Sequence, residues 1–213
     1  MSLINRKTQL LGQVDKLAFD KKGKQIDVLF VGNKFVELNN VRSKHHSLAL
    51  NIRRLQRLVL LTEIYYMQLH KEGLIKQDWE DYKDVNGLAC HNLYTYNSHN
   101  TGEIKLTKKI WYHSYYKLPQ KEYEAKIDPS LNAELNEIVE EIYNITEFID
   151  SVDLISMLRV DFPAGMSVPQ YYSGMGGDFP IDKSIIYEKF KDFDFNRLRE
   201  LNEQQKQNFS LEM

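Results

Sequence analysis

This 213-residue chain has a single cysteine and no long apolar run, and we expect no leader peptide at its N-terminus. Its single cysteine, Cys90, excludes a disulfide within the chain and favours a reducing compartment. The densest apolar stretch, Leu58–Leu61, is far too short to span a bilayer, and no apolar segment follows the first residues. We therefore expect a cytoplasmic protein without a membrane partner, or a virion component if a bacterial virus encodes it.

Motifs for metal, nucleotide or nucleophilic chemistry are also missing. One cysteine cannot form a CxxC pair, and Cys90 with His91 or His113 has no third group placed to orient a catalytic base. The glycine-rich stretch 173–178 lacks the Lys-Ser/Thr pair of a phosphate-binding loop, and no apolar strand leads into it. We therefore expect no cofactor, no metal site, no small-molecule substrate and no enzymatic activity.

Proline and glycine are scarce, at 5 and 10 residues, and they gather in one segment. That segment, 162–181, contains Pro163, Gly165, Pro169, Gly174, Gly176, Gly177 and Pro180. A stretch of this composition predicts a long loop or arm, which in a compact domain is functional or disordered. Its Tyr171, Tyr172 and Met175 are side chains suited to contact a protein neighbour.

Charge is divided unevenly along the chain, although the net charge is only −2. Residues 1–120 contain 19 Lys and Arg against 11 Asp and Glu, whereas residues 121–213 contain 9 against 19. Segregated charge steers and orients partners, including other copies of the same chain. The division therefore predicts head-to-tail contacts, provided that the two halves do not neutralise each other within one molecule.

A first long helix is predicted near 43–72 by apolar residues at alternating spacings of four and three. No acidic residue occurs between Leu38 and Thr62, and this region holds the candidate partner-binding residues Arg42, His46, Arg53, Arg54 and Arg57. If one helix contains them all, Arg42, His46, Arg53 and Arg57 form a basic stripe. Such a stripe binds phosphates or an acidic protein surface; the alternative is a solvated face, or one neutralised by the chain's own acidic helix.

β-Hairpin elements are predicted near 14–38 and 88–118, where β-branched and aromatic residues flank turn signals. The second hairpin contains Lys105, Lys108 and Lys109 interleaved with aromatic residues. Basic and aromatic side chains in alternation can hold and stack nucleic acid, although any half-buried sheet has a similar composition. Nucleic-acid contact by this hairpin and the basic helix is therefore the alternative function.

A second long helix is predicted near 129–158, with Asp128 or Ser130 as its N-cap and Pro129 in its first turn. Apolar residues recur at heptad spacing: Leu131, Leu135, Ile138, Ile142, Ile145, Ile149 and Val152. The seam indicates either a coiled coil or, as we favour, a helix packed into the domain core. Residues 182–213 predict a shorter helical segment, broken near 192–194.

These patterns together predict an α+β fold dominated by helices, with residues 1–161 forming the main domain. Two long amphipathic helices and a shorter C-terminal helix pack with one or two β-hairpins. We expect a non-enzymatic assembly subunit that joins copies of itself head to tail in a ring or larger complex. Connector or adaptor proteins of bacterial viruses are one example of such assemblies.

Overall fold

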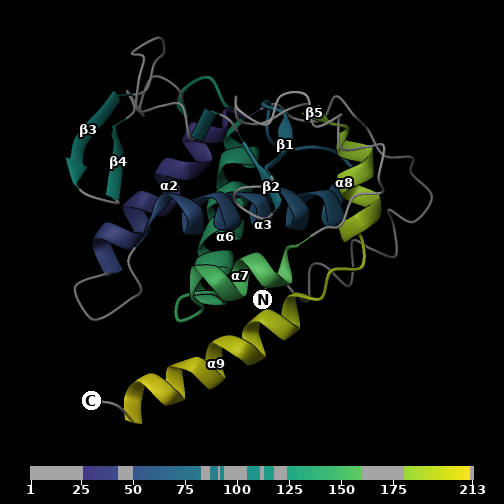
Figure 1. Cartoon of the computed structure of the whole chain (residues 1–213). Coiled ribbons are helices and arrows are strands. Elements are labelled where there is room, and N and C mark those ends of the chain that lie inside the picture. The colour runs from purple at the N-terminus through teal and green to yellow at the C-terminus, as the bar shows by residue number, and fades with distance from the viewer. Residues whose placement is uncertain are drawn as a thin grey trace.

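The computed structural model shows a helix-dominated α+β fold, which confirms the predicted fold class (Figure 1). It describes residues 26–42, 50–82, 87–90, 92–93, 105–110, 113–117, 124–159 and 180–211. Helix α3 lies at the centre and contacts helices α2, α6, α7 and α8 and strand β2. Among the described residues, no helix is both long and apolar enough to cross a membrane.

Helix α3 (Ile52–His70) is buried on every side along most of its length. The side chain of Asn51 caps its N-terminus by accepting from the amide of Arg54 at 2.9 Å. Its C-terminus is closed by Lys71, which adopts the left-handed conformation with φ 54° and donates its amide to Met67. The end of the helix predicted near 43–72 is confirmed, but the start is wrong because α3 begins at Ile52, with Asn51 as its cap. Residues 43–49 lie outside the described part of the chain.

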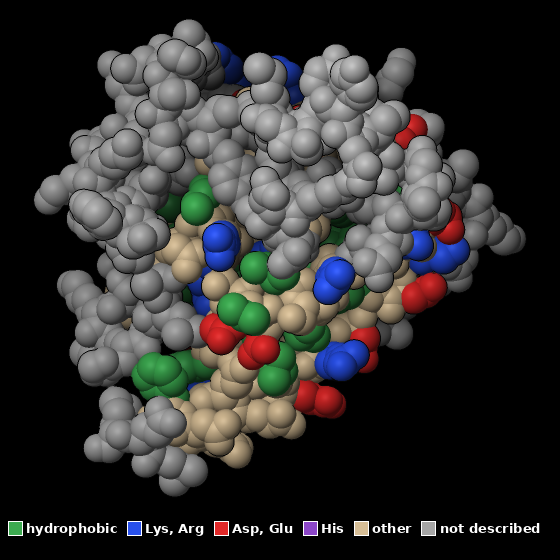
Figure 2. Space-filling model, in the orientation of Figure 1, with side chains coloured by type: hydrophobic (Ala, Val, Ile, Leu, Met, Phe, Trp, Pro, Cys, Tyr) green, Lys and Arg blue, Asp and Glu red, His purple; other side chains and the backbone are tan. Residues whose placement is uncertain are grey.

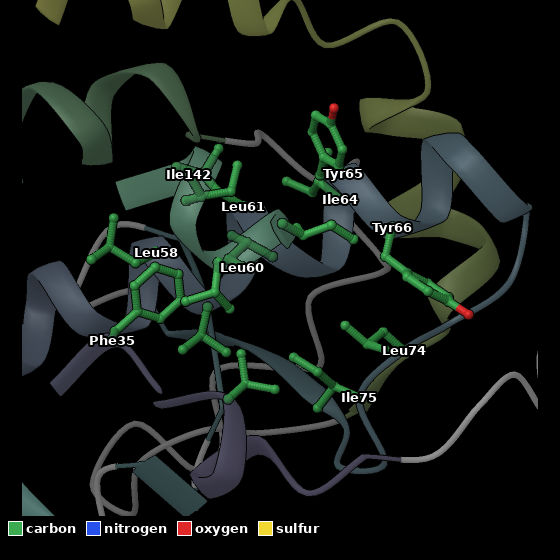
Figure 3. Packing of buried hydrophobic residues seen from close by; sticks show 14 of the residues in the cluster. Phe35, Leu58, Leu60, Leu61, Ile64, Tyr65, Tyr66, Leu74, Ile75 and Ile142 are labelled. Carbon is green, nitrogen blue, oxygen red and sulfur yellow. The ribbon is translucent and has the colours of Figure 1, made fainter. Parts of the chain in front are cut away.

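The apolar core surrounds α3 and draws on every neighbouring element (Figure 3). Leu58, Leu60, Leu61 and Ile64 of α3 are each 0% exposed, because α3 is enclosed rather than laid on a surface. Neighbouring elements supply Phe35 of α2, Ile142 of α6, and Leu74 and Ile75 of the segment after α3. Because α3 is enclosed, most of the polar side chains on it are buried as well and must find hydrogen-bond partners within the protein.

Helix α2 (Val28–Arg42) occupies residues 28–38 of the region in which a hairpin is predicted near 14–38. That prediction is wrong for residues 28–38, and residues 14–25 lie outside the described part of the chain. The Asp27 side chain accepts from the amide of Leu29 at 2.9 Å and opens the helix. Buried apolar runs fit a strand or an enclosed helix equally well, and residues 28–36 are buried throughout.

Helices α6 (Pro129–Asn144) and α7 (Ser151–Met157) replace the single helix predicted over 129–158. Asp128 caps α6 with Pro129 in its first turn, as the sequence predicts. Five of the six seam residues from Leu131 to Ile149 are at most 5% exposed and Leu131 is 7% exposed, which confirms a core role. The chain turns after Asn144, Asp150 caps α7, and Val152 is left 66% exposed.

Two small antiparallel sheets complete the described part of the fold. Strands β1 (Trp79–Tyr82), β2 (Gly87–Ala89) and β5 (Pro180–Ile181) form one sheet in the order β2-β1-β5. Strands β3 (Lys105–Ile110) and β4 (His113–Lys117) form the other, and β4 packs against α2. The predicted hairpin near 88–118 is thus wrong in its first arm, because β2 pairs with β1 instead.

The C-terminal segment forms α8 (Lys183–Phe190) and α9 (Phe195–Leu211), which confirms the predicted break near 192–194. Phe190, Phe195 and Leu198 are at most 6% exposed and anchor both helices on the core. Helix α9 then runs along the edge of the molecule (Figure 1). Within the predicted loop 162–181, only Pro180 and Ile181 are described, and they belong to β5.

Candidate functional site

A cleft of about 430 Å³ lies between α2 and α6. It is lined by Lys34, Glu37, Leu38, Val41, Arg42, Glu124, Asn136, Val139 and Glu140. The α2 residues recur every three or four positions, so they share the helix face that is turned toward α6. Apolar side chains between charged ones of both signs are typical of a surface that binds another molecule.

Lys34 forms the inner part of this cleft and is only 7% exposed. Its Nζ donates to Oδ1 of Asn136 at 2.6 Å and lies 3.6 Å from Oε1 of Glu124. The ammonium also lies 4.5 Å from the ring centroid of Phe30, a cation–π contact. Burial lowers the pKa of Lys34, and the nearby carboxylate of Glu124 opposes that shift.

Arg42 and Val41 form the outer part of the cleft. The Arg42 guanidinium donates to Oε1 of Glu140 at 2.6 Å and to Oδ1 of Asn144, and it lies 5.7 Å from the Tyr143 ring centroid. Val41 beside it is 73% exposed, which is high for a large apolar side chain. The apolar surface of Val41 is therefore open to contact by another molecule.

Arg54, a predicted partner-binding residue, is 3% exposed and serves the fold instead. Its guanidinium donates to the carbonyls of Ile149, Thr146 (2.6 Å) and Glu147 (3.1 Å), where the chain leaves α6. Burial lowers the pKa of Arg54 to about 10. The prediction for Arg54 is wrong, because carbonyls that α6 leaves open at its end need a donor.

Arg57, also predicted to bind a partner, is 1% exposed. Its Nη1 donates to the carbonyl of Leu88 in β2 at 2.6 Å. Gly87, at φ 138°, would place a Cβ atom 3.6 Å from the same nitrogen. Arg57 is therefore enclosed by the chain, and the prediction that it binds a partner is also wrong, because its guanidinium binds a carbonyl of the chain itself.

The basic and acidic parts of the sequence meet inside one molecule, as one of the two sequence interpretations allows. Residues on α6 or just before it pair with residues of the first part of the chain: Glu134 with His70 at 2.6 Å, Glu140 with Arg42, and Glu124 with Lys34 at 3.6 Å. Figure 2 shows acidic and basic side chains close together on the face in view. The predicted stripe of Arg42, His46, Arg53 and Arg57 on one helix is therefore wrong, because Arg42 ends α2 and Arg57 is buried.

The other residues predicted to bind a partner are exposed, lie in a strand, or fall outside the described part of the chain. Arg53 is exposed on α3. Lys105, Lys108 and Lys109 belong to β3, whose pairing with β4 shifts register between Leu106 and Lys108. Lysines and bulges are common devices that keep the edge of a small sheet from pairing with another chain. His46, Tyr171, Tyr172 and Met175 lie outside the described residues.

Lys34 and Val41, which define the cleft, are not among the residues that the sequence patterns predict to bind a partner. Lys34, Leu38 and Val41 do follow helical spacing, but a strand prediction for this region hides that relation. Helix α3 also carries five buried polar side chains whose hydrogen-bond partners cannot be predicted from the sequence: Arg54, Gln56, Arg57, Glu63 and Gln68. These buried side chains bind the backbone of surrounding segments.

Cys90 is 0% exposed, as expected for a small buried apolar residue. Gln56 holds its backbone on both sides: the Cys90 amide donates to Oε1 at 3.0 Å, and Nε2 donates to the Cys90 carbonyl at 2.9 Å. Burial raises the pKa of the Cys90 thiol to about 12, so the reactive thiolate is scarce near neutral pH.

We therefore expect Cys90 to react with a disulfide reagent only when the chain opens. The labelling rate of the native chain should be orders of magnitude below that of the urea-unfolded chain, and should rise with urea as unfolding does. The measurement is thiol release followed by absorbance, with free cysteine as the reference. Rapid labelling of the native chain would contradict the burial of this residue.

No group of three or more His, Cys, Asp or Glu side chains suited to a metal ion is found in the part of the chain that is described. The site is therefore characterised by the cleft, by Lys34 within it and by Val41 at its opening. Comparison with protein-family models, with curated proteins and with solved structures finds no match to this chain.

Proposed function

We propose that the chain is a non-enzymatic assembly subunit that binds other copies of itself through the α2–α6 cleft. The observation that supports this most is the exposure of Val41, 73%, at the opening of a cleft whose other apolar residues are Leu38 and Val139. An apolar centre with charges around it is the usual anatomy of a protein interface. We place such an assembly in the cytoplasm or in a virion.

Val152 on α7 is the surface that we propose for the other side of the contact. Val41 and Val152 are the large apolar side chains that stand most exposed among the described residues, at 73% and 66%. Acidic residues flank Val152, with Asp150 exposed and Asp153 half-buried, and Arg42 lies beside Val41 in the cleft. The cleft also holds Glu37, Glu124 and Glu140, so we propose that Val152 of one copy inserts into the cleft of the next mainly through apolar contact, with its flanking carboxylates turned toward Arg42.

A contact between two different surfaces is heterologous, so it repeats from copy to copy and closes into a ring or grows as a filament. The ion pairs that Arg42 and Arg199 form with α6 reduce the charge that is free for this contact. The apolar pair must therefore provide most of the affinity, and charge must set its orientation. We accordingly expect salt to weaken the assembly without abolishing it.

The test uses Val41→Asp and Val152→Asp, each of which places a charge on one of the two surfaces. We expect either variant alone to sediment as a monomer, because each lacks one of the surfaces that every copy needs. An equimolar mixture should form a dimer through the one cleft and the one valine that stay intact. Both positions are exposed, so folding should be unaffected, which circular dichroism checks.

Two results would contradict the proposal. A Val152→Asp variant that assembles like the unchanged chain would show that α7 takes no part, and a cleft that pairs with itself would remain. A mixture that stays monomeric would show that the two surfaces do not meet. Nucleic-acid binding, the alternative function, now depends on the β3–β4 hairpin and Arg53, because Arg54 and Arg57 are enclosed.

A further inference from the structure

Lys34 provides the α2–α6 cleft with an amine group that the proposed assembly does not require. It is an amine at the inner end of a cleft of about 430 Å³, with its side chain 8% exposed. Neighbouring apolar residues Leu38 and Val139 can take the body of a small molecule. Pockets that hold small molecules combine such apolar lining with a few fixed polar groups.

We propose that Lys34 is a covalent capture site for small, uncharged aldehydes with an apolar chain. The inference goes beyond the assembly proposal and requires no turnover. It rests on the position of the amine in the cleft, on its fixed hydrogen-bond partner Asn136, and on a carboxylate within reach.

The orientation of the amine suits attack on a carbonyl carbon. Asn136 Oδ1 accepts from Nζ at 2.6 Å and so fixes the nitrogen on the wall of the cleft. Glu124 Oε1, at 3.6 Å, is near enough to exchange a proton with it, directly or through one water. Desolvation lowers the pKa of Lys34, which makes the neutral amine more available than that of an exposed lysine.

The reaction forms a Schiff base and releases one water. The neutral Nζ attacks the aldehyde carbon, and the Glu124 carboxylate carries one amine proton to the carbonyl oxygen, which gives the neutral carbinolamine. Glu124 then takes the second amine proton and delivers it to the carbinolamine hydroxyl, which leaves as water while the C=N bond forms. Amine and aldehyde thus give imine and water, without an oxidant or reductant.

The charge of the cleft selects the class of carbonyl compound. Glu37, Glu124 and Glu140 face it together with two cations, Lys34 and Arg42. Lys34 must be neutral to react, and Arg42 is already bonded to Glu140 and Asn144. The reacting cleft is therefore acidic, so it should repel an oxo acid and admit an uncharged aldehyde.

The experiment treats the native chain with butanal or with 4-oxobutanoate and traps the imine with cyanoborohydride. The chain is used at a concentration at which sedimentation gives the mass of one chain, so the outcome does not depend on assembly. Mass spectrometry of the digested chain compares labelling at Lys34 with that at Lys76 and Lys189, which are exposed and serve as internal references. Each probe is also applied to the urea-unfolded chain.

We expect butanal to label Lys34 several times faster than the two reference lysines, and 4-oxobutanoate to show no such preference. Unfolding should remove the difference, since it depends on the cleft. The proposal is overturned if Lys34 reacts with butanal no faster than Lys76 and Lys189. It is equally overturned if the oxo acid labels Lys34 as selectively as butanal does, because the charge argument then fails.

Discussion

Arg54→Met is expected to lower the free energy of unfolding by roughly 3–5 kcal/mol. The variant keeps an apolar side chain of similar length but removes the donors to the carbonyls of Thr146, Glu147 and Ile149. Those carbonyls lie in the turn between α6 and α7, where the helix supplies no partner of its own. The turn should therefore lose its attachment to α3, and urea-induced unfolding measures the effect.

The adjacent residue provides a matched control. Arg53 precedes Arg54 directly, is exposed, and should change stability by no more than about 0.5 kcal/mol when replaced by Met. The same pair separates two explanations of the basic region. If the region served only to bind nucleic acid, both substitutions would reduce binding and neither would destabilise the chain. Equal stability of the two variants would contradict the role that we assign to Arg54.

Glu63→Ala is expected to lower the free energy of unfolding by a similar amount, roughly 3–5 kcal/mol. The Glu63 carboxylate is 0% exposed, and its Oε2 accepts from the amides of Leu74 at 3.0 Å and Ile75 at 2.8 Å. Lys183 of α8 approaches Oε1 to 3.3 Å and also donates to the Ile75 carbonyl. One side chain thus joins α3, the segment after it and α8, and truncation leaves all three without their partner.

Glu63→Gln separates hydrogen bonding from charge. The amide oxygen can still accept from both backbone amides, so the loss should be smaller, about 1–3 kcal/mol. Burial raises the pKa of Glu63 from its ordinary value of 4.5, so its ionisation disfavours the folded state. The unchanged chain should therefore lose stability relative to the Gln variant as pH rises from below 4.5 to neutral. Thermal unfolding at both pH values measures this difference.

The exposed Glu203 of α9 is the control for both substitutions at Glu63, and Glu203→Gln should leave stability within about 0.5 kcal/mol. A Glu63→Ala variant as stable as the unchanged chain would show that the carboxylate does not hold these segments together. A relative stability that rises with pH would instead mean that Lys183 and the two amides outweigh desolvation.

Local signals in the sequence were enough to predict the start of α6, the buried face of its apolar seam, and the break in the C-terminal segment, but not the turn that separates α6 from α7. Asp128 and Pro129 mark the start of α6, and the apolar seam from Leu131 to Ile149 is buried. The break between α8 and α9 was also predicted. These features depend on neighbours within a few residues along the chain, which a sequence displays directly.

Helix α2 could not be predicted because its glycine fits both a turn and a closely packed helix. Gly32 and Asn33 resemble a turn, but Gly32 lies inside the helix where a Cβ atom would approach Leu93 Cδ2 to 3.4 Å. A glycine at that position allows two segments to pack closely, a contact between residues that are distant in sequence. Periodicity cannot distinguish that use of glycine from a turn.

The roles of the arginines could have been predicted in part. Arg54 lies four and seven residues before Leu58 and Leu61, on a face that periodicity assigns to the core. The sequence shows this position but not the carbonyls of residues 146–149 that make burial of its charge tolerable. The distribution of charge along the chain was likewise visible, whereas its neutralisation by α6 depends on tertiary structure.

The central claim is that copies of this chain join through the Val41 cleft and that segregated charge mainly stabilises the single molecule. Sedimentation equilibrium of the unchanged chain, over rising concentration in low and in high salt, tests this most directly. We predict a mass above that of one 25.2 kDa chain that grows with concentration and persists, reduced, in high salt. A chain that remains at 25.2 kDa at every concentration in both salts would contradict the claim.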